Sequence, residues 1–453
     1  MTLHIPDDFF DQPGELPDGH VANPALVAVL DWLVSHIAEK DWAQRRMAAL
    51  KHYMATSLGE PGGSDDGGRF YEERDLAAWY LLLLTTHLQH PLFYDYTAGC
   101  RVIPLFYSLG RDIELLKEVG GVSERVIRML GAERAQVDAG IYELLVALAY
   151  KRAGSDVSFR PERPGNAKTH DMDVSLRGVQ WAVECKRLNT SEYIDAERTV
   201  VRGLWQAASF KLRQLRLDAR CHCRFIKKVE TVPSTYLMGH LARWFNDGAL
   251  LRHTWSDEFG MGSFERHDLR QAQAHFEQFD VNRNSAAFLE LLTGRYYRGM
   301  NFLASFAAKP ADNLLFIDSL DAAIVLEWES LSDEAINSKA RDVMKRLSSA
   351  MPQLPDDVPG VVHIGLEAIE GDAVEARRIE KIRSSLARFD PRGKPLEHVY
   401  VNWFAPDCPP NELFDFQETA SVKGIRPKHP APLTDGALVV PMGEEGRPGA
   451  FWE

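Results

Sequence analysis

Residues 139–188 read AGIYELLVALAYKRAGSDVSFRPERPGNAKTHDMDVSLRGVQWAVECKRL, and this stretch decides the fold that the sequence predicts. Glu143 is the only charged residue between Ala139 and Tyr150, and the apolar residues around it recur at helical spacing. Gly154 is the residue type expected just past a helix end. Because carboxylates are almost never fully buried without a partner, Glu143 predicts a functional group on a largely buried helix.

Three segments with the composition of β-strands follow this helix. They are residues 156–160, 171–176 and 179–186. Only Arg177 and Gly178 separate the last two, and a two-residue turn of this kind is typical of a β-hairpin. The stretch therefore predicts a helix, a strand and a hairpin in an α/β protein.

Pairing inward from this turn places Asp171 opposite Glu184, with Asp173 and Lys186 on the same face of the hairpin. Two carboxylates in this arrangement repel each other, and burial adds a desolvation cost. Lys186 compensates one charge. A divalent ion bound by Asp171 and Glu184, with Glu143 reaching in from the helix, would compensate the rest, and oxygen ligands suit Mg²⁺ or Mn²⁺. Asp173 stays open as an alternative ligand in another register.

At this point the residues resemble a known family. A Glu-bearing helix, a strand that opens with Asp and a Glu-x-Lys on the next strand are similar to the PD-(D/E)xK nuclease superfamily, which has the restriction-endonuclease-like fold. Asp171 matches the motif's Asp, Glu184 and Lys186 match its (D/E)xK, and Glu143 matches the helix Glu found in many members. His170 stands where the motif has a proline, a position that varies in the superfamily.

The resemblance covers residues 137–228 and implies a mixed central sheet flanked by helices. It implies a metal-dependent nuclease, more often an endonuclease than an exonuclease, that hydrolyses phosphodiester bonds with Mg²⁺ or Mn²⁺. DNA is the expected polymer, with RNA not excluded. Asp171 and Glu184 would bind the metal directly, Lys186 would orient the attacking water and contact the phosphate, and Glu143 would bind a second metal or a metal-bound water.

A basic stretch follows the Glu-x-Lys strand. Residues 191–217 read as one long helix, and between residues 198 and 228 nine basic residues stand against a single acidic one. In nucleases of this fold the helix after this strand commonly faces the substrate backbone. The resemblance therefore implies contacts to nucleic acid from Arg198, Arg202, Gln206, Lys211 and Arg213, with Arg202 and Gln206 near the scissile phosphate. A solvated basic face without a partner remains the alternative.

The whole chain has 453 residues, and 52 basic against 65 acidic residues give a net charge of −13. This charge argues against a protein that coats nucleic acid, so any DNA contact must be local. The five scattered cysteines predict no disulfide framework, and Cys221-His-Cys223 lacks a second pair at zinc spacing. The chain starts without a signal-like segment, and its most apolar stretch, 76–84, is too short to span a bilayer. We expect a cytoplasmic protein without membrane association, with a homodimer or another protein partner left open.

Four regions are predicted along the chain. They are a helical N-terminal domain at 1–132, the nuclease core at 133–230, a mostly helical insertion at 231–311, and an α/β continuation with an irregular tail at 312–453. In the last region, four segments should add strands to the nuclease sheet. They are residues 313–318, 322–327, 361–366 and 398–404.

Two other classes of function remain open. The first is a non-catalytic nucleic-acid-binding or scaffold protein that keeps the nuclease fold. The presence of all four motif residues argues against it, because a protein that loses the catalytic activity in evolution usually loses one of these residues. The second is a helical interaction protein whose α/β part is structural, which the acidic net charge favours. A cleavage assay with Mg²⁺ or Mn²⁺ separates the three classes.

Overall fold

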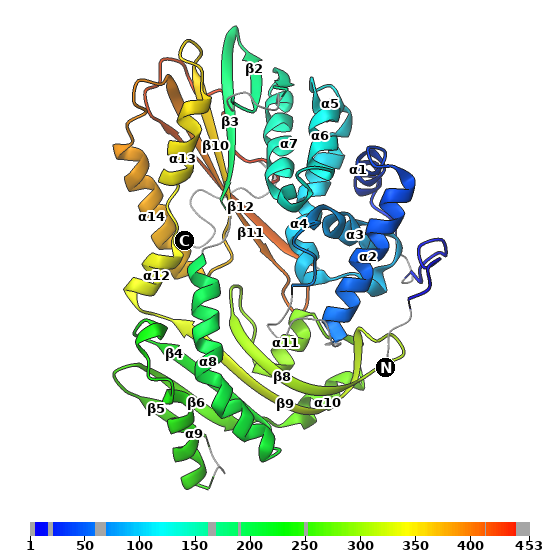
Figure 1. Ribbon diagram of the computed structural model, residues 1–453, viewed down its shortest axis with the longest axis vertical. Coiled ribbons are helices and arrows are strands. Elements are labelled where there is room, and N and C mark those ends of the chain that lie inside the picture. The colour runs from blue at the N-terminus through cyan, green and yellow to red at the C-terminus, as the bar shows by residue number, and fades with distance from the viewer. Residues whose placement is uncertain are drawn as a thin grey trace.

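A computed structural model describes residues 5–16, 21–58, 69–161, 169–188, 192–248, 252–412 and 414–440, and the statements on structure below refer to these residues. The chain is mixed α/β, with helices packed around two mixed β-sheets. Figure 1 shows the first sheet in the upper half and the second in the lower half, with the N-terminal helices beside the first. Among the described helices, none is long and apolar enough to cross a membrane.

The chain before the motif is helical, in agreement with the pattern of its sequence. Its helices are α1 Pro24–Val34, α2 Glu39–Leu58, α3 Leu76–Gln89, α4 Tyr96–Arg111, α5 Ile113–Lys117 and α6 Val122–Leu130. Asn23, Asp75 and Asp95 cap α1, α3 and α4, because each side chain accepts hydrogen bonds from backbone N–H groups of the first turn. The apolar sides of these helices share one core with α7 (Val137–Arg152) and the hairpin.

The first sheet has the strand order β1-β2-β3-β10-β11-β12. The strands are β1 Asp156–Phe159, β2 Met172–Leu176, β3 Val179–Leu188, β10 Gly360–Glu367, β11 Leu396–Asp407 and β12 Asp415–Gly424. The three middle strands, β3, β10 and β11, are parallel, and the outer pairings are antiparallel. Helix α7 packs on one face, whereas α13 (Met344–Ala350) and α14 (Asp372–Arg388) cover the other. Strand β3 is therefore a central strand covered on both sides.

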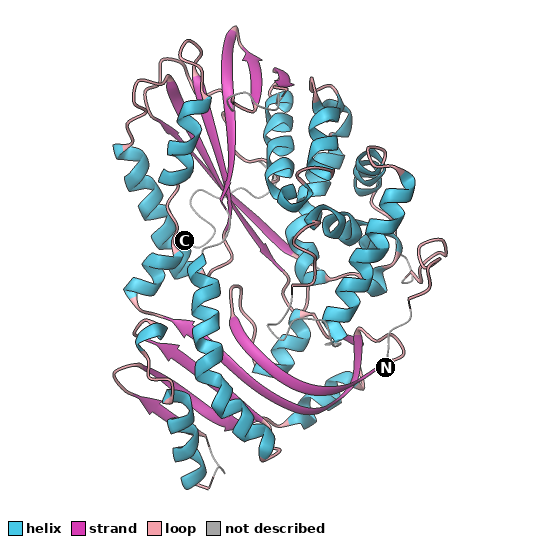
Figure 2. Cartoon of the chain, viewed as in Figure 1, coloured by secondary structure: helices cyan, strands magenta, loops and turns pink. Residues whose placement is uncertain are grey.

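The second sheet has the order β5-β6-β4-β9-β7, with β8 also paired to β9. The strands are β4 Ala219–Phe225, β5 His253–Ser256, β6 Gly260–Arg266, β7 Val281–Asn282, β8 Asn301–Pro310 and β9 Phe316–Ser330. Its helices are α8 Glu192–Gln214, α9 Tyr236–Asn246, α10 Leu269–Phe276 and α11 Ala286–Thr293, and α12 Asp333–Lys339 follows β9. Figure 2 shows the two sheets in magenta as separate groups of strands.

The second sheet corrects three expectations. The region 231–311, expected to be mostly helical, contributes β5, β6, β7 and β8. The strands expected at 313–318 and 322–327 form one long strand, β9, which joins the second sheet and not the first. Strands β5 and β6 are short and contain polar residues. Strand β4 pairs with a strand about a hundred residues later in the chain, so local sequence patterns could not reveal this sheet.

Two expectations in the last region have different outcomes. The strands expected at 361–366 and 398–404 are present as β10 and β11 and do extend the first sheet. The tail expected to be irregular instead contains β12, which pairs with β11 over ten residues from Asp415 to Gly424. Residues 441–453 of that tail lie outside the described residues.

Candidate functional site

The hairpin has the register that the turn predicts. Leu176 pairs with Val179 and Asp173 with Ala182, because Arg177 and Gly178 both adopt positive φ angles, 52° and 80°, as a tight hairpin turn requires. This register brings Asp171, just before β2, next to the middle of β3. The Asp171 N–H donates to the carbonyl of Val183 at 3.1 Å, and its Oδ2 accepts the N–H of Cys185 at 2.6 Å.

The Glu184 side chain is the most confined carboxylate of the motif. Its residue is 0% exposed. The reason is that β10 pairs with β3 and the helices on that side close over it. Lys186 pairs with Oε1, whereas Oε2 has no hydrogen-bond donor within reach. The Glu184 carboxyl lies beside the carboxyl of Asp171, and the two can hydrogen-bond only if one of them carries a proton.

Both carboxyls are consequently poor acids. Burial, and then the charges of Glu143 and Glu184, raise the pKa of Asp171 well above its usual range. Burial raises the pKa of Glu184 to about 7, against the opposing effect of Lys186. An isolated buried carboxylate pair is unfavourable, so at neutral pH the pair needs a proton or a bound cation.

Glu143 lies on α7, is 8% exposed, and interacts electrostatically with both carboxyls of the pair. Its direct partner is Arg125 on α6, whose Nε donates to Glu143 Oε2 and whose Nη1 donates to Glu133 at 2.9 Å. Sequence analysis missed Arg125, because an arginine in an amphipathic helix gives no sign of facing the interior. Glu143 is thus held by a buried guanidinium beside the carboxylate pair.

The ionised groups of the site do not balance one another. Glu143, Asp171 and Glu184 carry three negative charges when ionised, and Arg125 and Lys186 carry two positive ones. One proton would balance the remaining negative charge, and one divalent cation would more than balance it. In the described part of the chain, Glu143, Asp171 and Glu184 do not form a group of three whose ligand atoms lie close enough together to hold one metal ion. Asp171 and Glu184 form the close pair, and Glu143 interacts with both.

Asp173 lies outside this pair. Its carboxylate is 2.8 Å from Arg160 Nη1 and 2.7 Å from His170 Nε2, and its side chain is 43% exposed. Both oxygens therefore already have cationic or hydrogen-bonding partners near the surface. The structure places Asp171, and not Asp173, next to Glu184.

The basic helix does not lie against the hairpin. Helix α8 begins near the end of β3 and runs over the second sheet, where Leu204 and Trp205 are part of the core (Figure 1). Its polar residues have different surroundings: Arg198 lies over the ring of Trp328 at 5.9 Å, Arg202 and Lys211 are half-buried, and Gln206 and Arg213 are exposed. The structure therefore brings together the four motif residues but places the predicted nucleic-acid contacts on the other sheet.

Glu184→Gln should become more stable than the wild type as the pH rises in metal-free buffer. The pKa of Glu184 is about 7 in the folded protein and near 4.5 unfolded, so the folded state binds more protons between these values. Wild-type stability from this group is present below pH 4.5 and is lost as the pH rises through 7. The difference should reach ~3 kcal/mol at pH 8. Urea denaturation at pH 5 to 8, with the exposed Glu192→Gln as control, measures it, and parallel pH profiles would contradict it.

Comparison with known proteins gives no relative for this arrangement. No protein-family model, no curated protein and no solved structure matches the chain. The buried carboxyl pair and the residues around it are therefore the features from which a function can be inferred.

Proposed function

We propose that this protein is a metal-dependent nuclease of the PD-(D/E)xK type, which hydrolyses phosphodiester bonds in DNA, with RNA not excluded. The observation that carries the proposal is Glu184 Oε2, a fully buried oxygen without a donor, beside the carboxyl of Asp171. Glu197 and Asp95 also have a buried oxygen without a hydrogen-bond partner, but Glu184 differs in having a second buried carboxyl, that of Asp171, beside it. A Mg²⁺ or Mn²⁺ ion between these two carboxyls would satisfy the free oxygen.

The surroundings of the pair also support the proposal. The first sheet is mixed and has helices on both faces, as the restriction-endonuclease-like arrangement requires. Within it, the Glu-bearing helix α7 packs against β3, and the Asp and Glu-x-Lys positions are cross-strand neighbours. The order of the residues in the sequence and their proximity in space both fit the same motif.

Each motif residue would have a separate role in the reaction. Asp171 and Glu184 would hold the metal ion, which when bound lowers the pKa of a coordinated water and neutralises charge that develops on the phosphate. Lys186, on the same strand face as Glu184, would orient the attacking water and stabilise the phosphate. Arg125 fixes the Glu143 carboxylate, which is then placed to accept a hydrogen bond from a water at the ion.

A plasmid-nicking assay tests the function. The wild type should nick supercoiled plasmid with Mg²⁺ or Mn²⁺ and should lose this activity in EDTA. Asp171→Asn should be inactive, because it removes a ligand of the ion. Asp173→Asn is the matched control, since Asp173 belongs to the same strand but lies near the surface with partners of its own. DNA binding without nicking under all of these conditions would favour the non-catalytic alternative instead.

The basic helix α8 gives a separate prediction about DNA binding. Replacing Arg202, Lys211 and Arg213 with Gln should weaken binding equally for all DNA sequences. It should also reduce the slope of log affinity against log salt by roughly one unit for each lost phosphate contact. The control is Lys309→Gln on β8, whose side chain is 67% exposed. An unchanged slope, measured by fluorescence anisotropy across a salt series, would show that α8 is a solvated basic face.

A further inference from the structure

A second group of possible metal ligands lies on the second sheet, far along the sequence from the motif. Residues of β4 alternate in direction: Cys221 and Cys223 point into the core beneath α8 and α9, whereas His222 points to the opposite face. On that face His222 is the register partner of Glu327 on β9, and Glu329 follows two residues later. Sequence analysis missed this group because its members are about a hundred residues apart.

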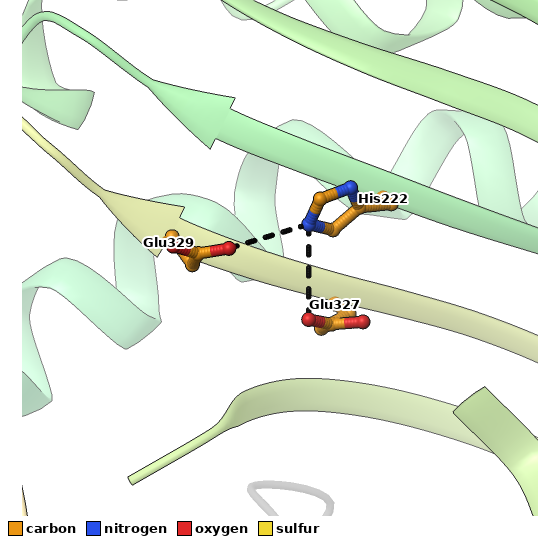
Figure 3. A group of neighbouring side chains, drawn as sticks. All are labelled: His222, Glu327 and Glu329. Atoms are coloured by element: carbon orange, nitrogen blue, oxygen red, sulfur yellow. Dashed lines mark ion pairs between the residues drawn. The ribbon is translucent and has the colours of Figure 1, made fainter. Parts of the chain in front are cut away.

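The distances in this group match those of a metal site. His222 Nε2 lies 3.7 Å from Glu327 Oε1 and 3.5 Å from Glu329 Oε1, and the three ligand atoms all lie within 4.8 Å of one another (Figure 3). Two ligand atoms about 2.1 Å from a tetrahedral zinc ion are about 3.4 Å apart. Only small side-chain movements would therefore place the imidazole and both carboxylates around one ion.

The surroundings of His222 already hold a cationic group. Its Nε2 contacts the guanidinium of Arg295, which also binds Glu327, with Nη2 2.6 Å from Oε1 and Nε 3.0 Å from Oε2. The imidazole and the Glu327 carboxylate thus contact a positively charged group that the protein itself supplies, and Glu329 lies close enough to interact with that group electrostatically.

The Arg295 side chain is exposed enough to move out of the site into solvent. Its side chain is 46% exposed, and that of Arg224, which binds Glu329 at 3.3 Å, is 42% exposed. Either guanidinium can therefore move into solvent, and an ion bound at the site would then take over as the partner of the buried Glu327 carboxylate, whose side chain is 5% exposed. Tyr297, whose hydroxyl donates to Glu327 Oε1 at 2.9 Å, would remain as a support for that ligand.

A cavity of about 200 Å³ adjoins the group and is lined by His222 and Glu327. Three arginines, Arg220, Arg252 and Arg295, also line it. The three protein ligands leave at least one position of a tetrahedral ion open, and sites of that kind bind water or a further ligand. Arg220 and Arg252, which would stay when Arg295 leaves, would favour an anionic group, such as a phosphate, at that position.

We propose that His222, Glu327 and Glu329 form a binding site for a single divalent transition-metal ion such as Zn²⁺, and that Arg295 occupies this site until the ion displaces it. Mixed imidazole and carboxylate ligands suit Zn²⁺ better than Mg²⁺. The site does not include Asp171 or Glu184, so the test of this proposal does not depend on the nuclease proposal.

Calorimetric titration with Zn²⁺ tests the site in the full-length Asp171→Asn/Glu184→Gln variant, which lacks the carboxylate pair of the first sheet. This protein should bind one Zn²⁺. Adding His222→Ala or the isosteric Glu329→Gln should weaken binding by roughly ten- to a hundredfold or more. Arg295→Gln should tighten it, because a competing cation is removed. Glu265→Gln is the matched control, since Glu265 lines the same cavity but is not one of the three ligands.

Two results would overturn the proposal. One is the absence of saturable Zn²⁺ binding in that background. The other is binding that survives both His222→Ala and Glu329→Gln unchanged, with circular dichroism showing that both variants are folded. An Arg295→Gln variant that binds Zn²⁺ no tighter than its parent would contradict the displacement of Arg295 and would make the network a permanent ion-pair cluster.

Discussion

Lys186→Met should cut DNA at least about a hundredfold more slowly than the wild type, a loss of ~3 kcal/mol of transition-state stabilisation, while still binding Mn²⁺. Protonated lysine has no lone pair for a metal, so its loss removes no ligand. In the proposed mechanism it would remove the charge that faces the phosphate and the group that orients the water. Because Lys186 also lowers the pKa of Glu184, binding should be compared at pH 8 or above, where a proton competes less with the ion.

The measurement is a plasmid-nicking time course beside a calorimetric Mn²⁺ titration of the same samples. Lys151→Met is the matched control, since Lys151 lies in the last turn of α7 and pairs with Glu118 at 3.0 Å. It should nick DNA at the wild-type rate. If Lys186→Met also nicks at that rate, any activity does not depend on the motif, and the scaffold alternative becomes the better one.

Arg125→Met should destabilise the protein by ~3 to 5 kcal/mol, because it leaves the buried Glu143 carboxylate without its counter-charge. Glu143→Gln should recover much of this loss when added to Arg125→Met, since no unpaired charge then remains in the interior. Urea denaturation at neutral pH in EDTA measures both effects. The pair and the two single variants form a double-mutant cycle that isolates the interaction.

Arg128→Met is the control for this cycle. Arg128 also belongs to α6 and binds Glu133 at 3.0 Å, but its side chain is 26% exposed, and exposed ion pairs contribute about 0 to 1 kcal/mol. An Arg125→Met variant as stable as Arg128→Met would mean that Arg125 is not the cation that holds Glu143.

Local sequence patterns were sufficient for the first sheet around the motif. The apolar period of α7 and the Arg177-Gly178 turn depend on neighbours in the chain, so the helix, the hairpin and its register were predictable. The proximity of Asp171 and Glu184 followed from that register. The strands β10 and β11 were also recognisable, because parallel strands covered on both faces are continuous apolar runs.

The parts that were wrong or missed depend on contacts between distant segments. Helix α8 has a clear apolar stripe, but the stripe does not say which sheet it covers, and the assignment to the nuclease core placed its basic residues near the phosphate. Arg125 could not be matched to Glu143 without the packing of α6 on α7. In the same way, His222 and Glu327 become neighbours only through the pairing of β4 with β9.

The most direct test of the carboxylate pair is a crystal structure of the protein grown with Mn²⁺ at pH 8, with an anomalous difference map. The account predicts a peak about 2.1 Å from one oxygen each of Asp171 and Glu184, which disappears in Asp171→Asn. A map with no peak there, or with a peak only at Asp173, would contradict the claim that this buried pair is the metal site.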